Sequence, residues 1–283
     1  VLSNTDISGS KVVVSANKSL TLDLNGKEVQ AVNNGNIFVS GKLTICDTSD
    51  GAQGTIRATQ KYGGSNTGGI VVASGEDALL TMESGNIVAS GFEDPKNNGQ
   101  FGVMVQGGGD FTMTGGKIEA GWYAAAGNGN DETTNSVINI QGGELISTAD
   151  YALYLPQSGT TTISGGTIRG AAGGISIQRG TLTIDNDNAL ITSLGTGDTG
   201  DWGDGTGGQD PAALNIAAEY GDTSVTISAG KFIAEQKDLF IKAPTEYTVA
   251  LAITGGYYSN DPSEFLTTVD EKNYAAVESD LDG

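Results

Sequence analysis

The sequence predicts an all-β protein, a right-handed single-stranded parallel β-helix (β-solenoid) in which the chain winds through about nine stacked coils. Two observations predict this fold: a recurring apolar–Thr–apolar triplet, and a pair of small residues that follows most of its copies. Successive triplet centres lie 21 to 43 residues apart, the length of one coil with or without an insert. The nine triplets are Leu20-Thr21-Leu22, Leu43-Thr44-Ile45, Leu80-Thr81-Met82, Phe111-Thr112-Met113, Ile138-Asn139-Ile140, Thr161-Thr162-Ile163, Leu182-Thr183-Ile184, Val225-Thr226-Ile227 and Leu251-Ala252-Ile253.

The alternation of side chains along a β-strand explains the triplet. Its first and third residues face one side of the strand, and the central residue faces the other. Coils stacked about 4.8 Å apart place equivalent residues in columns. We therefore expect a continuous apolar core column and an outer column of Thr, in which only Asn139 and Ala252 differ. The next outward column mixes acids, amides and hydroxyls, and we interpret it as a solvated face.

The small-residue pairs after the triplets predict the corners of the coil. Glycine makes up 44 of the 283 residues, far above the usual share of about 7%. A glycine pair suits a corner that needs positive φ or leaves no room for a Cβ. Extra length collects after the second short strand of a coil, in residues 60–67, 91–98 and 194–209. Inserts on one edge either build a binding face or vary because nothing packs on them.

The whole chain, residues 1–283, is predicted to form a single domain, because solenoids grow by adding coils. The coils cover about residues 11–266, and residues 261–283 form a C-terminal cap and the start of a following segment. Asp261, Pro262 and Glu264 have the spacing of a helix start. A short helix here would protect the open edge of the last coil.

The regular coils, and the C-terminal run from Gly255 to Phe265, resemble the β-helical repeat regions of large adhesin-like surface proteins of gut Firmicutes. More distantly, the coils resemble the pectate-lyase-like β-helix superfamily. The resemblance covers about residues 11–278. It implies a fold and a bacterial surface setting, but no particular activity.

The net charge of −20, from 34 acidic and 14 basic residues, restricts the partners. Nucleic acids and anionic membrane surfaces would be repelled. The chain has no apolar run of about 18 residues, so we expect no membrane insertion. Cys46 is the only cysteine and allows no intrachain disulfide. We expect a secreted or cell-surface bacterial protein, present as a monomer.

Few enzyme chemistries are open to this chain. It has no histidine, so Cys46 lacks an imidazole partner and His metal ligands are excluded. Carboxylate chemistry, as in glycoside hydrolases, or calcium with a basic residue, as in β-helical lyases, remains. The arginines, Arg57, Arg169 and Arg179, have no acid cluster beside them in the sequence. We therefore assign no catalytic residue and no required cofactor, with a polysaccharide lyase or glycoside hydrolase as the alternative.

Aromatic residues near the insert corner are the candidate ligand-binding residues. An exposed ring beside amides and carboxylates can stack on a sugar whose hydroxyls those groups bind. A continuous strip of such rings along the corner would suit an extended neutral glycan, because the net negative charge of the protein would repel an acidic one. Alternatively, the rings lie over the corner and fix the loop. The candidates are Phe92, Trp122, Tyr123, Tyr151 and Trp202.

The acidic loop of residues 195–210 is the candidate metal site. Asp198, Asp201 and Asp204 recur every three residues among glycines that could let the carboxylates surround calcium. The spacing matches neither an EF-hand nor a calcium nonapeptide repeat. A solvated acidic loop is the alternative. Taken together, the sequence favours a non-catalytic binding or spacer module that contacts a host or environmental glycan or surface protein.

Overall fold

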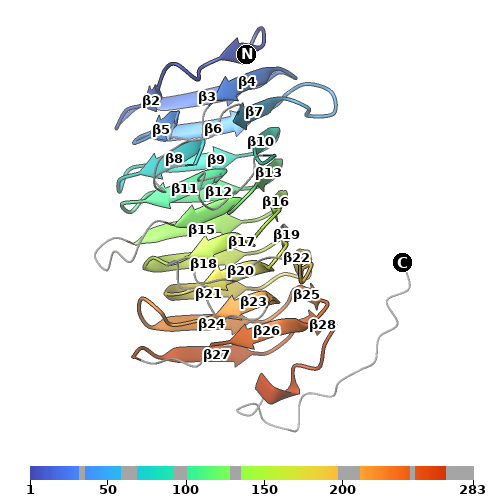
Figure 1. Cartoon of the computed structure of the whole chain (residues 1–283). Helices are drawn as coiled ribbons and strands as arrows, with labels where there is room; N and C mark the ends of the chain where they lie inside the picture. Colours follow the sequence, from blue (N-terminus) through green and yellow to red (C-terminus); the bar gives the residue numbers. More distant parts are fainter. Residues whose placement is uncertain are drawn as a thin grey trace.

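The structure is a computed structural model, which describes residues 1–31, 36–58, 69–91, 101–127, 135–196, 211–242 and 246–265. Their regular structure is almost entirely β-strand, with one short 3-10 helix, η1 (Ser263–Phe265). The strands form three sheets, each made of parallel strands, and the sheets run along a common axis (Figure 1). This arrangement is the right-handed parallel β-helix that the sequence predicts.

The three sheets, called A, B and C, each take one strand from every coil. Sheet A consists, in spatial order, of β1 (Thr5–Asp6), β4 (Glu28–Ala31), β7 (Thr55–Ala58), β10 (Asn86–Ala89), β13 (Lys117–Ala120), β16 (Glu144–Ser147), β19 (Gly166–Gly170), β22 (Ala189–Ser193), β25 (Lys231–Ala234) and β28 (Tyr257–Tyr258). Sheet B consists of β2 (Val12–Val14), β5 (Ile37–Val39), β8 (Val71–Ser74), β11 (Val103–Gln106), β14 (Ala125–Gly127), β17 (Tyr151–Leu155), β20 (Gly173–Ile177), β23 (Ala212–Ile216) and β26 (Lys237–Ile241). Sheet C consists of β3 (Ser19–Asp23), β6 (Lys42–Cys46), β9 (Leu79–Met82), β12 (Asp110–Met113), β15 (Ser136–Ile140), β18 (Gly159–Ile163), β21 (Gly180–Ile184), β24 (Thr223–Ile227) and β27 (Val249–Ile253).

Each coil passes through sheet B, then sheet C, then sheet A. Coil one is β2–β3–β4, coil two is β5–β6–β7, and the pattern continues to coil nine, β26–β27–β28. Neighbouring coils therefore contribute adjacent strands to every sheet. Strand β1 precedes coil one and pairs with β4 in sheet A.

The triplets form sheet C, and the strand register confirms their predicted alignment. Thr21 pairs with Thr44, Thr44 with Thr81, and Thr81 with Thr112. The column continues without a slip through Asn139, Thr162, Thr183, Thr226 and Ala252. Every member of this column is exposed or half-buried, so the outward direction of the central residue is confirmed as well.

The third residues of the triplets form the predicted core column. From Ile45 in coil two to Ile253 in coil nine they are all buried, whereas Leu22 in the end coil is half-buried. Leu20, also in the end strand β3, is 42% exposed. The coil interior is thus one continuous apolar core that loses its cover only towards its ends.

The corners between sheets C and A use the predicted small-residue pairs. The second residue of each pair is a glycine with φ between +80° and +106°, a conformation that favours glycine. A Cβ on Gly143 would lie 2.6 Å from the Met113 Cε atom and 2.7 Å from the Gly116 carbonyl oxygen. Both the backbone angle and the stacking of corners therefore require glycine at this position. The pairs end at Gly85, Gly116, Gly143, Gly166, Gly230 and Gly256.

The predicted inserts all fall at one corner. Residues 60–67, 91–98 and 194–209 join a strand of sheet A to the next strand of sheet B, namely β7 to β8, β10 to β11 and β22 to β23. The corner is the one expected from the sequence. Most residues of these inserts lie outside the described ranges.

The short helix η1 follows the helix start that the sequence predicts. The Ser263 backbone N–H donates to Asp261 Oδ1 over 2.9 Å at the start of η1. Phe265 packs against the core. The start of the following segment, expected before residue 283, lies outside the described residues. Within the described ranges, no helix is long and apolar enough to cross a membrane.

We predict that Ile163→Ala lowers the free energy of unfolding by about 2–5 kcal/mol, because Ile163 is fully buried and its loss leaves a cavity. Thr162→Ala, one residue away on the outer face, should cost less than about 1 kcal/mol. Urea unfolding followed by circular dichroism measures both. Equal losses would contradict the assignment of inner and outer positions.

Candidate functional site

Trp122 and Tyr123 lie at the corner between β13 and β14, where coil four passes into coil five. Their ring centroids are 5.0 Å apart. Phe101 stacks on Trp122 at 4.9 Å, and Tyr154 stacks on Tyr123 at 4.6 Å. These four rings, which we call the aromatic cluster, form one stacked group beside sheet B.

The rings that the sequence nominates for sugar stacking are buried. Trp122 is 4% exposed, Tyr123 is 1% exposed and Tyr151 has no exposed surface. They pack with Val72 and Met104, which point outward from sheet B. The expectation of an exposed strip is therefore wrong for these three residues. A sugar cannot stack on a ring face that other side chains already cover, and the geometry matches the alternative in which the rings fix the corner.

The sequence contains a signal for this burial. Sheet B has uninterrupted apolar runs, including residues 71–73, 103–105 and 124–126. An uninterrupted apolar strand is typical of a strand covered on both faces, whereas an alternating strand has one solvated face. The outward residues of sheet B in coils three to six are Val72, Met104, Ala126 and Tyr154, and all are buried.

Asp150 anchors the aromatic cluster. Its carboxylate accepts a hydrogen bond from Trp122 Nε1 over 3.0 Å and from the Tyr151 backbone N–H over 2.8 Å. The Ser147 hydroxyl donates to the Trp122 carbonyl and accepts from the Asp150 N–H. This buried acid therefore holds a corner in place. Phe92 and Trp202, the other two aromatic candidates, lie outside the described residues.

The predicted calcium ligands Asp198, Asp201 and Asp204 also lie outside the described residues. Among the residues that the structure does describe, no group of three or more His, Cys, Asp or Glu side chains could hold a metal ion.

Acids at several turns tie neighbouring coils together. Asp47 accepts hydrogen bonds from the backbone N–H groups of Gly26, Ser49 and Gly54. Burial raises the pKa of Asp47, but these hydrogen bonds outweigh that effect and hold the pKa below its usual value. Asp23 accepts from Thr48 of the next coil, and these bonds lower the pKa of Asp23.

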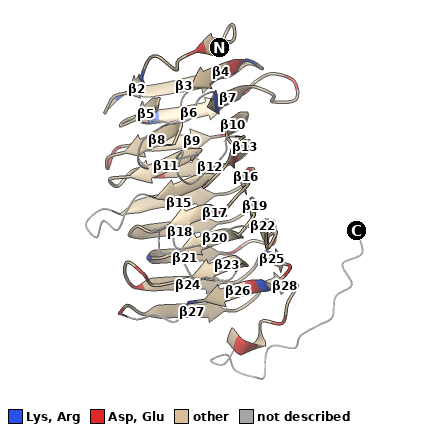
Figure 2. Ribbon diagram, viewed as in Figure 1, with Lys and Arg blue, Asp and Glu red and all other residues tan. Residues whose placement is uncertain are grey.

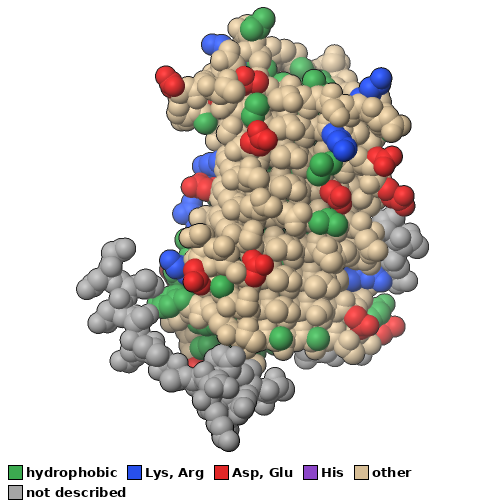
Figure 3. Space-filling view, turned by 180° about the vertical axis from the view of Figure 1, so that it is seen from behind, with side chains coloured by type: hydrophobic (Ala, Val, Ile, Leu, Met, Phe, Trp, Pro, Cys, Tyr) green, Lys and Arg blue, Asp and Glu red, His purple; other side chains and the backbone are tan. Residues whose placement is uncertain are grey.

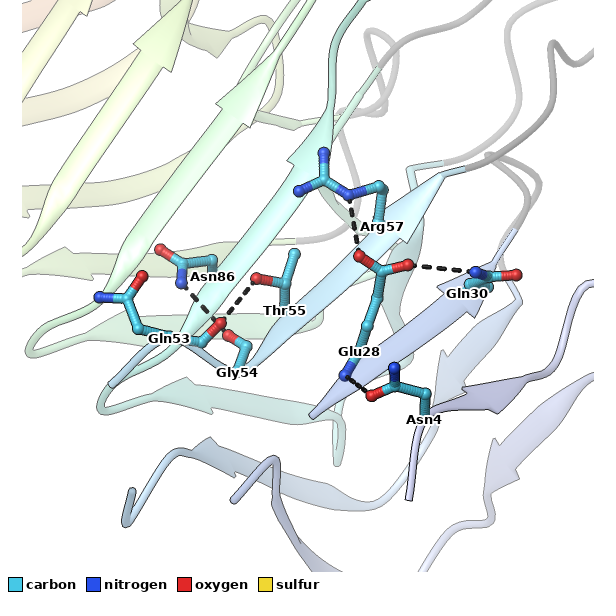
Figure 4. Close-up of polar contacts among 8 residues, drawn as sticks. All are labelled: Asn4, Glu28, Gln30, Gln53, Gly54, Thr55, Arg57 and Asn86. Carbon is cyan, nitrogen blue, oxygen red and sulfur yellow. Dashed lines mark hydrogen bonds and ion pairs between the residues drawn. The ribbon is translucent and has the colours of Figure 1, made fainter. Parts of the chain in front are cut away.

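The outer face of sheet A carries opposite charges that pair both between coils and within one strand. Arg57 Nε donates to Glu28 Oε2 over 3.2 Å, and Glu28 accepts a second bond from Gln30 (Figure 4). On β13, Lys117 Nζ lies 2.8 Å from Glu119 Oε2. This contact is the main reason that the pKa of Glu119 is lowered. These exposed pairs are screened by solvent and stabilise the fold little. They show how coil stacking supplies Arg57 with an acid that is 29 residues away in the sequence.

The outer face of sheet C in coils six to eight carries a regular array of hydroxyl groups. Thr160, Thr181 and Ser224 are aligned in one column, and Thr162, Thr183 and Thr226 in the next. Ser164 and Ser228 lie in a third column, in which Asp185 holds the middle place. We call the eight hydroxyl residues the hydroxyl grid. Its columns step about 4.8 Å from coil to coil, and neighbouring columns lie two residues apart along each strand.

The hydroxyl grid is exposed or half-buried and nearly free of charge. The same three columns in coils one to three include Asp23, Lys42 and Glu83, so the uncharged region is local.

Charged residues of the described chain gather mainly at turns and strand ends, away from the middle of the strands (Figure 2). Seen from behind, charged and hydrophobic side chains are scattered among uncharged polar groups and backbone (Figure 3).

Comparison with protein-family models, with curated proteins and with solved structures finds no match to this chain.

We predict that Trp122→Ala lowers the free energy of unfolding by about 3–5 kcal/mol, because it removes a buried ring and leaves Asp150 without the indole donor. Trp122→Phe should cost less, since the ring stack is kept. Thermal unfolding compares the two variants. A Trp122→Ala protein as stable as the wild type would contradict the burial.

We predict that Asp47→Asn destabilises the protein at pH 7 by about 1–3 kcal/mol, because a charged acceptor of three backbone donors becomes neutral. The folded-state pKa of Asp47 is lowered, so its stabilisation is present above the unfolded-state pKa and is lost as the pH falls through the folded-state value. The difference between wild type and variant should therefore shrink below about pH 4. Asp50→Asn, at an exposed position of the same turn, is the control. A pH-independent difference would contradict this role.

Proposed function

We propose that this chain is a non-catalytic binding or spacer module of an extracellular, adhesin-like bacterial surface protein, and that it contacts a neutral glycan. Three features support the proposal: the stacked coils, which form an extended scaffold; the net charge of −20, which disfavours anionic partners; and the resemblance to surface β-helices. A host or environmental surface protein is the other partner that this setting allows.

The observation that carries the proposal is the hydroxyl grid. Each Ser or Thr hydroxyl can donate and accept hydrogen bonds, as a sugar hydroxyl can. The three columns run along the axis on outward positions of consecutive, in-register strands. An extended neutral polymer lying along the axis would meet a hydroxyl at each of coils six to eight in two of the three columns. Many weak contacts of this kind add up when they are made together.

Two matched double variants test the assignment. Thr162→Lys with Thr183→Lys places two ammonium groups in the centre of the hydroxyl grid. Thr167→Lys with Thr192→Lys makes the same change in the same two coils, but on the outer face of sheet A. Glycan arrays that hold neutral and acidic polysaccharides identify a ligand, and calorimetry gives its affinity.

We expect the sheet C variant to lose at least about tenfold in affinity, a loss of about 1.4 kcal/mol, and the sheet A variant to bind as the wild type does. Equal losses in the two variants would place the contact elsewhere. A wild-type protein that binds neither glycans nor mucosal surface proteins would favour a spacer without a ligand.

We also propose that Asp198, Asp201 and Asp204 bind calcium, on the basis of their spacing among glycines in the sequence. Calcium that binds only the folded state should raise the melting temperature, and Asp201→Asn should remove most of that shift. Differential scanning fluorimetry with millimolar calcium measures the shift, and magnesium serves as the control ion. The same melting temperature with and without calcium would contradict the site.

A further inference from the structure

Three polar side chains lie buried on the outer side of sheet B in coils seven and eight. Ser176 of β20 is paired in register with Asn215 of β23, and Gln178 follows the end of β20. Ser176 lies between Ile175 and Ile177, which belong to the core, so it points away from the coil interior. All three side chains nevertheless have no exposed surface.

The hydrogen bonds within this group leave two acceptors without a donor. Gln178 Nε2 donates to Ser176 Oγ over 2.9 Å, and Asn215 Nδ2 donates to the same oxygen over 3.2 Å. Gln178 Oε1 and Asn215 Oδ1 accept no hydrogen bond from the described part of the chain. A buried polar atom left unsatisfied in this way costs about 1–3 kcal/mol. Two such atoms beside one serine point to a ligand that supplies donors.

The number of donors and acceptors defines that ligand. Both lone pairs of Ser176 Oγ receive amide N–H groups, so its own proton is free to be donated. Each amide NH₂ group uses one N–H on Ser176 Oγ and keeps a second, so the group offers the serine proton, two N–H donors and two carbonyl acceptors. If either amide is turned end for end, the serine proton satisfies one carbonyl oxygen and an NH₂ group is freed instead. In each arrangement both donors and acceptors remain, which suits neither a bare cation nor an anion.

We propose that Ser176, Gln178 and Asn215 hold one ordered water molecule. Water donates to Gln178 Oε1 and Asn215 Oδ1 and accepts from the Ser176 hydroxyl, which satisfies the serine and both carbonyl oxygens. The site extends the outward column of sheet B beyond Tyr154, whose register partner is Ser176. The column changes there from a ring of the aromatic cluster to a polar, hydrated group. This inference is independent of the proposed glycan contact on sheet C.

A crystal structure at atomic resolution, from crystals grown without polyols, tests the site. We expect one density peak, of the size of water, about 3 Å from Gln178 Oε1, Asn215 Oδ1 and Ser176 Oγ. Asn215→Leu removes one acceptor and one donor and should abolish the peak while the coil is retained. Asn139→Leu, on the outer face of sheet C, should leave the peak in place.

Two further crystals distinguish the other occupants. Soaking with a neutral oligosaccharide should leave the peak unchanged, whereas replacement by larger density would show that the site takes sugar hydroxyls instead. Growth in rubidium chloride should give no anomalous signal there, and such a signal would show a cation and overturn the proposal. So would a wild-type structure in which the two amides satisfy each other and no peak is present. In solution, a water-to-amide Overhauser effect at the Gln178 side chain, lost in Asn215→Leu, provides the same test without a crystal.

Discussion

The register between neighbouring strands of sheet C is the constraint on which the rest of the structure depends. Because side chains alternate with a period of two, a slip of one residue in one coil would turn its Thr inward and its core residues outward. The ladder from Thr21 to Ala252 contains no such slip. Gly116, Gly143 and Gly166 then each lie against the corner glycine of the previous coil, and the outward columns become continuous. The core, the corners and the hydroxyl grid all follow from this one alignment.

Several acids in the described part of this chain of net charge −20 accept hydrogen bonds that hold turns and neighbouring segments together. Asp47 and Asp23 receive backbone or hydroxyl donors from neighbouring segments, and Asp238 receives the Asn260 backbone N–H over 2.6 Å near the last coil. These bonds offset charge repulsion locally, because each carboxylate is held by donors. Burial, with a smaller effect from the Asp238 charge, raises the pKa of Tyr258, so this ring stays protonated. An acidic composition is therefore compatible with a closely stacked fold, and it does not by itself indicate a metal site.

The sequence predicts the fold well because its signals are local. The triplet sets the strand period, and the glycine pair sets the corner that follows. The burial of Trp122 and Tyr123 was harder to predict, because it depends on sheet B, whereas the triplets form sheet C. Only the apolar outward residues of sheet B explain why these rings are buried. The ion pair of Arg57 with Glu28 depends on coil length, which inserts change from coil to coil. The hydroxyl grid was not predicted, because two of its three columns, taken over all nine coils, mix charged residues with hydroxyl residues. The grid becomes visible only when the three columns are compared coil by coil in coils six to eight.

The outer sides of the three sheets differ in chemistry along one axis, and β1 and β28 lie at opposite ends of sheet A. This arrangement has a mechanical consequence for a protein held at its two ends. The hydrogen bonds between coils run along the axis. A pulling force at the two ends therefore separates an end coil from its neighbour first, and it does not break the contacts between all coils together. Under tension the solenoid should lose coils from its ends in steps, each step releasing the length of one coil. Such a scaffold absorbs work gradually, and its middle coils would be the last to unfold.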